Sequence, residues 1–168
     1  MHMKNTESGS RVREELIHLL PRLRRLARAL TGHVDDADDL VQLVIERALA
    51  RASQWRPDGA LDRWVFAIAR NAWRDELRAR GRSREVFVPE DDDAATVADG
   101  SAPPAQRLAL AEAMAALPED HREVVALVLV EGLSYGEAAD LLGVPVGTVT
   151  SRLSRARSAL QDHLGSEA

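Results

Sequence analysis

The chain has 168 residues, 45% of them apolar and 29% charged, a composition that suits one compact soluble domain or two small ones. It has no cysteine, which excludes a disulfide framework and thiolate metal sites, and no apolar run approaches the ~20 residues that span a bilayer. The net charge of −5 is sorted along the chain: residues 1–82 carry 16 basic and 12 acidic groups, and residues 105–168 carry 5 basic and 9 acidic groups. The first residues contain no apolar signal segment, so we expect a cytoplasmic protein without membrane insertion.

Three helices are predicted in the first half of the chain. The first repeats apolar side chains every three to four residues beside an arginine face, and Pro21 within it predicts a kink or the start of a second helix. Asp35 resembles the N-cap of the next helix. The last of the three follows a Pro-Asp-Gly turn, buries a stripe that includes Trp64, and ends in several arginines. The predicted helices span residues 11–30, 36–51 and 60–80.

Residues 83–104 interrupt these periodic patterns. The segment carries six acidic groups and one basic group and ends in two prolines, so it offers little apolar surface for burial. Its charge predicts a solvated, extended chain. We therefore predict an acidic flexible linker between one domain over residues 1–82 and a second over residues 105–168.

Four short helices are predicted after the linker, and no segment alternates in the manner of a half-buried β-strand. The expected fold is therefore all-α, with two small helical domains, the C-terminal one a four-helix domain that contains a helix-turn-helix. These four helices span residues 105–116, 118–131, 134–142 and 146–164.

The last two predicted helices have the spacing of a helix-turn-helix. Counting the residue after Ser134 as the first, the small residue Ala139 is fifth, Gly143 is ninth in the turn, and the branched Val149 is fifteenth. Ser134 and the glutamate three residues later form a capping box, and Thr148 can cap the second helix. The second helix is therefore predicted to enter the major groove of DNA.

The exposed face of that second helix is polar, and no acidic residue occurs from residue 146 to residue 161. A solvated helix face normally mixes both signs of charge, so contact with DNA explains this face better than a merely structural arginine face does. The predicted face consists of Thr150, Ser151, Ser154, Arg155 and Ser158, flanked by Arg152 and Arg157.

Four blocks of sequence, in order along the chain, resemble the extracytoplasmic-function (ECF) group of sigma-70-type transcription initiation factors of bacteria. Residues 36–42 read DADDLVQ, like the family's DAEDLVQ, and residues 64–78 read WVFAIARNAWRDELR. Residues 116–124 read ALPEDHREV, and residues 132–157 read GLSYGEAADLLGVPVGTVTSRLSRAR. Together the blocks span nearly the whole chain on both sides of the linker, which makes the resemblance specific.

The resemblance implies that the protein binds core RNA polymerase and directs promoter-specific transcription initiation, and that an anti-sigma factor holds it inactive until a signal releases it. In this family the N-terminal domain contacts the β′ clamp helices of the polymerase. The same domain recognises and melts the −10 element, and a loop, here residues 54–62, captures a flipped base. The C-terminal domain contacts the β flap and reads the −35 element.

Carried over residue by residue, the resemblance assigns three groups of residues. Those implied for polymerase binding are Asp36, Asp39, Leu40, Gln42, Leu43 and Glu46. Those implied for −10 recognition and melting are Trp55, Arg63, Arg70, Asn71, Trp73, Arg74 and Arg78. Those implied for the −35 element are Thr148, Thr150, Ser151, Arg152, Ser154, Arg155 and Arg157, with Arg122 contacting the DNA backbone from upstream.

The sequence itself sorts the candidates on the third helix. Trp64 lies in the apolar stripe and is expected in the core, whereas Trp73 lies off its centre and is the better aromatic candidate for nucleic-acid or partner contact. Arg70, Arg74 and Arg78 lie on one side and form a possible track for phosphates.

Some positions leave alternatives open. Asn71 and Asp75 lie one helical turn apart, so either could bond within the fold instead of contacting DNA. Thr150 stands where the family often has a basic residue, and Ser154 where a larger side chain is frequent, which leaves the promoter sequence undetermined. The acidic linker at residues 91–93 could mimic nucleic acid inside the polymerase.

Other classes of protein fit the sequence less well. The five histidines are scattered and no Gly-rich phosphate loop or nucleophile motif occurs, so we expect no catalytic residue, cofactor or metal. A dimeric regulator would need a receiver or a ligand pocket, and residues 1–82 show no βα pattern. The chain could also serve mainly as the target of an inhibitor. We expect a monomer or a heterodimer with that inhibitor, and association of the two domains when it is absent.

Overall fold

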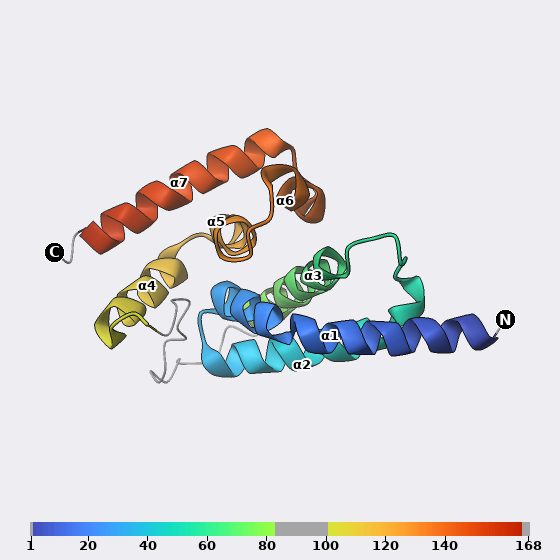
Figure 1. Cartoon of the computed structure of the whole chain (residues 1–168). Coiled ribbons are helices and arrows are strands. Elements are labelled where there is room, and N and C mark those ends of the chain that lie inside the picture. The colour runs from blue at the N-terminus through green and yellow to red at the C-terminus, as the bar shows by residue number, and fades with distance from the viewer. Residues whose placement is uncertain (1, 83–100, 166–168) are drawn as a thin grey trace.

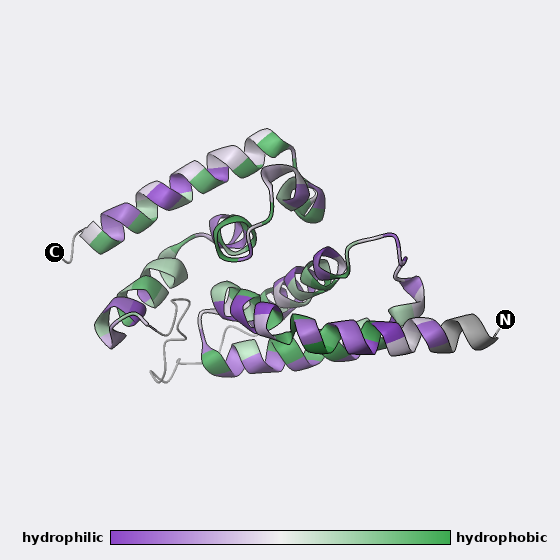
Figure 2. Cartoon of the chain, in the orientation of Figure 1, coloured by the Kyte–Doolittle hydropathy of each residue, from purple (hydrophilic) through white to green (hydrophobic). Residues whose placement is uncertain are grey.

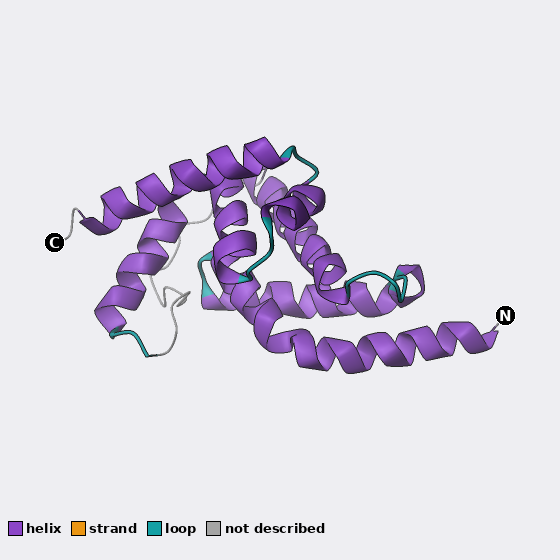
Figure 3. Cartoon of the chain, turned by 45° about the horizontal axis from the view of Figure 1, so that its top comes forward, coloured by secondary structure: helices purple, strands orange, loops and turns teal. Residues whose placement is uncertain are grey.

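The computed structural model describes residues 2–82 and 101–165, with side chains from residue 7 onward, and every regular element in these ranges is a helix (Figure 3). The all-α prediction is therefore confirmed. Residues 83–100 of the predicted linker, including residues 91–93, lie outside the described residues, so the domain boundary stays a prediction. The N-terminal helices are α1 (His2–Thr31), α2 (Val34–Ala50), the 3-10 turn η1 (Ala52–Gln54) and α3 (Leu61–Arg82). The C-terminal helices are α4 (Pro104–Ala116), α5 (Glu119–Val124), the π-helical segment η2 (Val125–Val130), α6 (Tyr135–Leu142) and α7 (Val146–Gly165).

α1 is a single helix of 30 residues with Pro21 in its interior. It changes direction along its length (Figures 1 and 3). A proline in a helix interior is the usual cause of such a kink, because it lacks the N–H that would bond to the preceding turn. The predicted kink is therefore present, and the alternative of a separate helix that begins at Pro21 is wrong.

The start of α2 differs from the prediction. His33, not Asp35, occupies the N-cap position, and its side chain makes no capping hydrogen bond. The turn before it is closed by Thr31, whose hydroxyl donates to the His33 carbonyl at 3.0 Å, and by Gly32 with φ of 75°. Asp35 and Asp36 lie in the first turn, where negative charge suits the positive end of the helix dipole.

The N-terminal helices pack through the apolar stripes that the sequence predicts. Leu23 and Leu26 of α1, Val44 of α2 and Phe66 of α3 are fully buried. Trp64 is half-buried and packs against the same core. These contacts hold α2 and α3 side by side, which sets the positions of the candidate polymerase and −10 residues.

The predicted helix over residues 118–131 is not regular. α5 covers only its beginning, and the chain then widens into η2, where the Glu131 amide donates to the Ala126 carbonyl five residues back at 3.0 Å. A π-helical turn holds more residues than an α-helical turn, so it changes the direction in which the following side chains point. Glu131 is buried as a result of this arrangement and bonds to arginines of α1.

One continuous apolar core joins the N-terminal and C-terminal helices. α5 lies between α7 and the N-terminal helices (Figure 1), and η2 packs against α1. Hydrophobic and hydrophilic residues form stripes along the helices (Figure 2), as expected when each helix buries one side. The two halves of the chain are therefore packed against each other in this structure.

Candidate nucleic-acid interface

α6 and α7 form the predicted helix-turn-helix. Ser134 Oγ accepts from the Glu137 amide at 3.1 Å, and Glu137 Oε2 accepts from the Ser134 amide at 2.9 Å, so the capping box is confirmed. Gly143 ends α6 in the left-handed region with φ of 66°, and Val149 is fully buried where α7 meets α6. Thr148 does not cap α7 as predicted, because the helix begins before it and Thr148 lies in the first turn.

α7 presents an exposed polar face. Arg155 and Arg157 are exposed, and neither pairs with a carboxylate among the described residues. The hydroxyls of Thr150 and Ser151 donate to carbonyls of their own helix at 3.1 Å, which leaves oxygen lone pairs free to accept. Ser154 is exposed as well. The face can therefore offer cationic donors and small hydroxyl groups to the edges and phosphates of duplex DNA.

Two of the three arginines in the predicted phosphate track on α3, Arg70 and Arg74, are engaged by carboxylates of α5. Arg70 Nε donates to Glu123 Oε1 at 3.1 Å, and Arg74 contacts both oxygens of Glu123, from Nε at 2.6 Å and from Nη2 at 2.8 Å. Asp120 Oδ1 accepts from Arg74 Nη2 at 2.5 Å, and its other oxygen lies 3.5 Å from Arg152 Nη2. Hydrogen bonding to Glu123 raises the pKa of Arg74 above its ordinary value. These guanidinium groups are therefore engaged within the protein.

The other candidates on α3 differ in their availability. Arg63 Nη1 lies 3.8 Å from Glu137 Oε1 of α6. Arg78 is exposed and lies 3.8 Å from Asp75 of its own helix. Asn71 is exposed, and its Oδ1 accepts from the preceding arginine at 3.2 Å. Arg78 and Asn71 thus remain open to solvent, whereas Arg63 meets the helix-turn-helix.

Two tryptophans do not have the exposure that the sequence interpretation requires. Trp73, predicted to be an accessible aromatic, is only 4% exposed and lies beneath the guanidinium of Arg80 at 5.3 Å. Trp55 is 6% exposed, with the Arg11 guanidinium 5.7 Å from its ring. The prediction for Trp73 is wrong because its helix buries a wider stripe than assumed. Trp73 follows the buried Ala69 by four residues, a spacing that could have indicated its burial.

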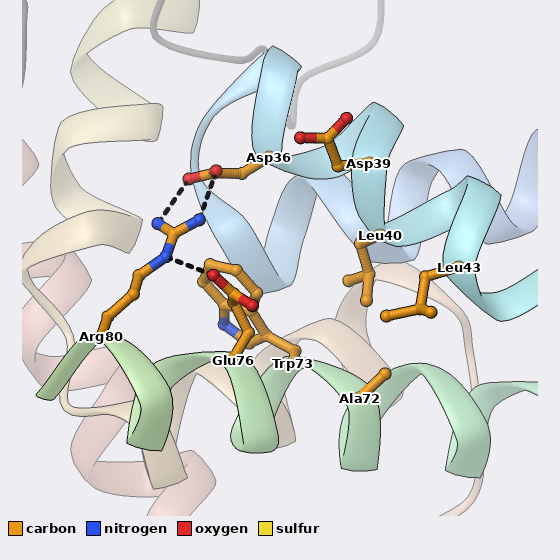
Figure 4. A pocket seen from close by; sticks show the side chains of 8 residues that line it. All are labelled: Asp36, Asp39, Leu40, Leu43, Ala72, Trp73, Glu76 and Arg80. Atoms are coloured by element: carbon orange, nitrogen blue, oxygen red, sulfur yellow. Dashed lines mark hydrogen bonds and ion pairs between the residues drawn. The ribbon is translucent and has the colours of Figure 1, made fainter. Parts of the chain in front are cut away.

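The acidic end of α2 and the end of α3 enclose a hollow (Figure 4). Arg80 closes one side of it, donating to both oxygens of Asp36 at 2.7 and 3.1 Å and to Glu76 at 2.9 Å. The hydrogen bonds to Asp36 raise the pKa of Arg80 above its ordinary value. Leu40 and Leu43 form an apolar wall opposite Trp73 (Figure 4).

The residues predicted to bind polymerase are unequally accessible on α2. Asp39, Gln42 and Glu46 are exposed, and Leu43 is half-buried. Leu40 is only 4% exposed, so its main contact is with the core. The structure therefore presents the polar members of this set to solvent and uses Leu40 to hold the helix in place.

Arg122, which the family resemblance implies as a DNA-backbone contact, is hydrogen-bonded within the protein. Its Nε donates to the Met114 carbonyl at 3.0 Å, and Nη2 donates to the carbonyls of Ala115 and Leu117 at 2.8 and 3.1 Å. Its Nη1 reaches the Leu30 carbonyl of α1 at 3.3 Å. Burial lowers the pKa of Arg122, although arginine stays charged at neutral pH. The guanidinium therefore caps the end of α4 and ties it to α1 instead of projecting toward DNA.

Sequence reasoning missed Glu123 and Glu131, the two buried glutamates of the C-terminal helices. Their side chains are 1% and 0% exposed. Glu131 accepts from Arg22 Nε at 3.0 Å and from Arg25 Nε at 3.3 Å, both on α1. The available signal was their position, because each directly flanks the apolar run of residues 124–130.

Other kinds of site find no support in the part of the chain that the structure describes. No group of three His, Asp or Glu side chains there could hold a metal ion. In the same residue ranges, no helix combines the length and the apolar character needed to cross a membrane.

Comparison with protein families matches both halves of the chain. The family described as Sigma-70, region 4 matches residues 107–160, which include the helix-turn-helix. The family described as the Sigma2 domain of PhyR matches residues 16–70. The two matches together include the described surfaces of α2 and α7, whereas residues 71–82 of α3 lie outside both.

Individual relatives match over most of the chain. It is 41% identical over 154 residues to the ECF RNA polymerase sigma factor EcfG of Rhodopseudomonas palustris, covering 89% of this chain and 82% of that protein. It is 39% identical over 150 residues to the ECF RNA polymerase sigma factor SigE of Mycolicibacterium smegmatis, covering 85% and 57%. Among solved structures, the sigma factor RpoE of Bartonella quintana in complex with the anti-sigma factor NepR has a TM-score of 0.80 and 34% identity, covering 91% of this chain and 96% of that one.

Proposed function

Because this chain belongs to the ECF family of RNA polymerase sigma factors, we propose how its surfaces divide the work of promoter-specific transcription initiation. The N-terminal helices, with residues 1–82, would bind core RNA polymerase and read and melt the −10 element. The C-terminal helices, with residues 105–168, would read the −35 element. The observation that carries this proposal is the helix-turn-helix whose second helix presents an exposed face without a single carboxylate from residue 146 to residue 161.

For the −35 element, α7 would lie in the major groove. Arg155 and Arg157 are free to meet phosphates or guanine edges, and Thr150, Ser151 and Ser154 can accept or donate single hydrogen bonds. Thr148 and Arg152 would contribute from the flanks of the same helix. Arg122 is not part of this proposal, because its donors are engaged by backbone carbonyls.

For the −10 element, the arginines of α3 would hold phosphates of the opened strand. Arg78 and Asn71 are exposed now, whereas Arg63, Arg70 and Arg74 become available only when the C-terminal helices move away. Trp55 and Trp73 are omitted because both are buried. The bound state therefore requires a more open arrangement of the two halves than the one in this structure.

For the polymerase, the exposed acidic and polar residues of α2 would contact the β′ clamp helices. Asp39, Gln42 and Glu46 are accessible, Leu43 adds apolar contact, and Asp36 is shared with Arg80. The C-terminal helices would meet the β flap. Because the two halves are then held by one large partner, each DNA contact can be weak alone and still contribute to a stable complex.

An anti-sigma factor is the second proposed partner. The related RpoE chain was solved in complex with the anti-sigma factor NepR, and it matches this chain across both halves. We infer that a partner of the same kind binds this chain and keeps it from the polymerase. The family does not consist of enzymes, so the chemistry of polymerisation belongs to core polymerase.

Runoff transcription tests the proposal. Core polymerase with this chain should produce discrete transcripts from some fragments of the source genome, and core polymerase alone should not. Arg155→Ala should reduce these transcripts strongly, whereas Arg24→Ala, an exposed arginine on α1 without an ion pair among the described residues, should not. Absence of any chain-dependent transcript would refute the proposed function.

A further inference from the structure

Glu123 and Glu131 hold the two halves of the chain together by charge as well as by apolar contact. We call them the interface glutamates. Each accepts hydrogen bonds from two arginines of the N-terminal helices, although the paired residues are 49 to 109 positions apart in the sequence. A buried carboxylate is strongly disfavoured unless it is paired and hydrogen-bonded, so these glutamates favour the arrangement in which the arginines surround them.

The π-helical segment is part of this arrangement. Glu123 lies in α5, two residues before η2 begins, and Glu131 directly follows η2. The wide turn of η2 changes the direction of Glu131 relative to a regular helix, and Glu131 then meets α1 while Glu123 meets α3. One short segment thus delivers a carboxylate to each of two N-terminal helices.

The arginines that Glu123 engages are those proposed to bind promoter phosphates. A guanidinium presents the same planar pair of donors to a carboxylate as to a phosphate, so it cannot bind both in this way at once. The side chains of Arg70 and Arg74 are only 19% and 25% exposed. The −35 face of α7 is not covered in this manner, because Arg155 and Arg157 remain exposed.

We propose that both interface glutamates keep the free chain closed, and that Glu123 competes with promoter DNA for Arg70 and Arg74, until polymerase separates the two halves. This inference rests on the proposed function and adds its regulation. The related RpoE chain bound to NepR matches this chain across both halves, so an anti-sigma factor would select a closed arrangement that the chain already adopts.

Spin labels on the full chain can measure whether the two halves separate. Because the chain contains no cysteine, two introduced cysteines would be its only labelling sites. Cysteines placed at Ala79 of α3 and Ala159 of α7, both exposed, would carry nitroxide labels for distance measurement by double electron–electron resonance. The double variant Glu123→Gln/Glu131→Gln should broaden the distance distribution toward longer values. The matched control Glu112→Gln/Asp140→Asn removes the same charge from exposed positions and should leave the distribution unchanged.

Binding of a fluorescein-labelled mixed-sequence single-stranded oligonucleotide, without polymerase, provides the second measurement. If the double variant raises the open fraction from about 1% to about 10%, the affinity should rise about tenfold, because apparent affinity scales with the binding-competent fraction. Adding Arg74→Gln to the double variant should remove most of that gain, because Arg74 is one of the released arginines.

The proposal requires both effects. It is overturned if the label distances stay unchanged, or if the oligonucleotide affinity rises no more than in the control. Should the double variant fail to fold, Asp120→Asn removes the charge of a half-exposed carboxylate that pairs with Arg74. It should change the label distances and the oligonucleotide affinity in the same direction by a smaller amount, with Asp140→Asn as its control. Neither measurement involves initiation, so failure here would leave runoff transcription, and with it the proposed function, intact.

Discussion

Replacing Arg122 by methionine separates a structural role for this arginine from the DNA contact that family resemblance implies. Arg122→Met keeps much of the apolar volume and removes hydrogen bonds to four carbonyls. Three of these, on Met114, Leu117 and Leu30, are partly buried. An unsatisfied buried acceptor costs about 1–3 kcal/mol, and water can reach part of the site, so we expect the free energy of unfolding to fall by about 3 kcal/mol.

Urea denaturation followed by circular dichroism measures this loss. Arg122→Lys retains the charge but cannot reach all four carbonyls, so it should lose about half as much stability. Arg24→Met, at an exposed arginine of α1 without an ion pair among the described residues, is the matched control and should change stability by less than about 0.5 kcal/mol. If Arg122→Met is as stable as this control but binds −35 duplex more weakly than the control does, the capping role is refuted and the measurements support a contact between Arg122 and DNA.

Three further predictions concern the turn, the recognition helix and the charge cluster. Gly143→Ala should destabilise the fold by about 1–2 kcal/mol in thermal melts, since its φ of 66° is left-handed although the added Cβ would meet open space; an unchanged melting temperature would contradict this. Arg155→Ala should weaken binding to promoter duplex without changing thermal stability. The slope of the logarithm of the binding constant against the logarithm of the salt concentration should fall by about one, the value for one phosphate contact, and an unaltered slope would exclude such a contact. Burial acts to raise the pKa of Asp120, but the hydrogen bond from Arg74 and the charge of Arg152 hold it below its ordinary value. The stabilisation that Asp120 contributes should therefore be complete above about pH 4 and be lost as the pH falls through the lowered pKa, so that Asp120→Asn flattens the acid branch of the stability profile.

Features decided within a few residues could be read from the sequence. The helix-turn-helix is an example: the capping box at Ser134 and the left-handed glycine at 143 depend only on neighbours within one turn. The kink in α1 likewise follows from one proline that lacks an N–H. These local rules sufficed to predict the helical class and the exposed face of α7.

Two local predictions, the caps at Asp35 and Thr148, were wrong, and further errors arose where a helix meets more than one partner. Trp73 lies off the centre of a single apolar stripe, but the wider buried face of α3 and the overlying Arg80 remove it from solvent. The irregular turn of η2 leaves no clear signature in an apolar run that also suits an α-helix. Such features depend on packing between helices, which periodicity along one helix does not describe.

The sequence by itself determined which segments are helical and where the helix-turn-helix lies, because capping, turn geometry and apolar spacing act over three or four residues. Only the tertiary structure decided which charges meet. Arg70 and Glu123 are 53 residues apart, and Arg22 and Glu131 are 109 apart. Their pairing depends on how α5 and η2 pack on α1 and α3, and that packing covers Arg70 and Arg74 of the predicted phosphate track.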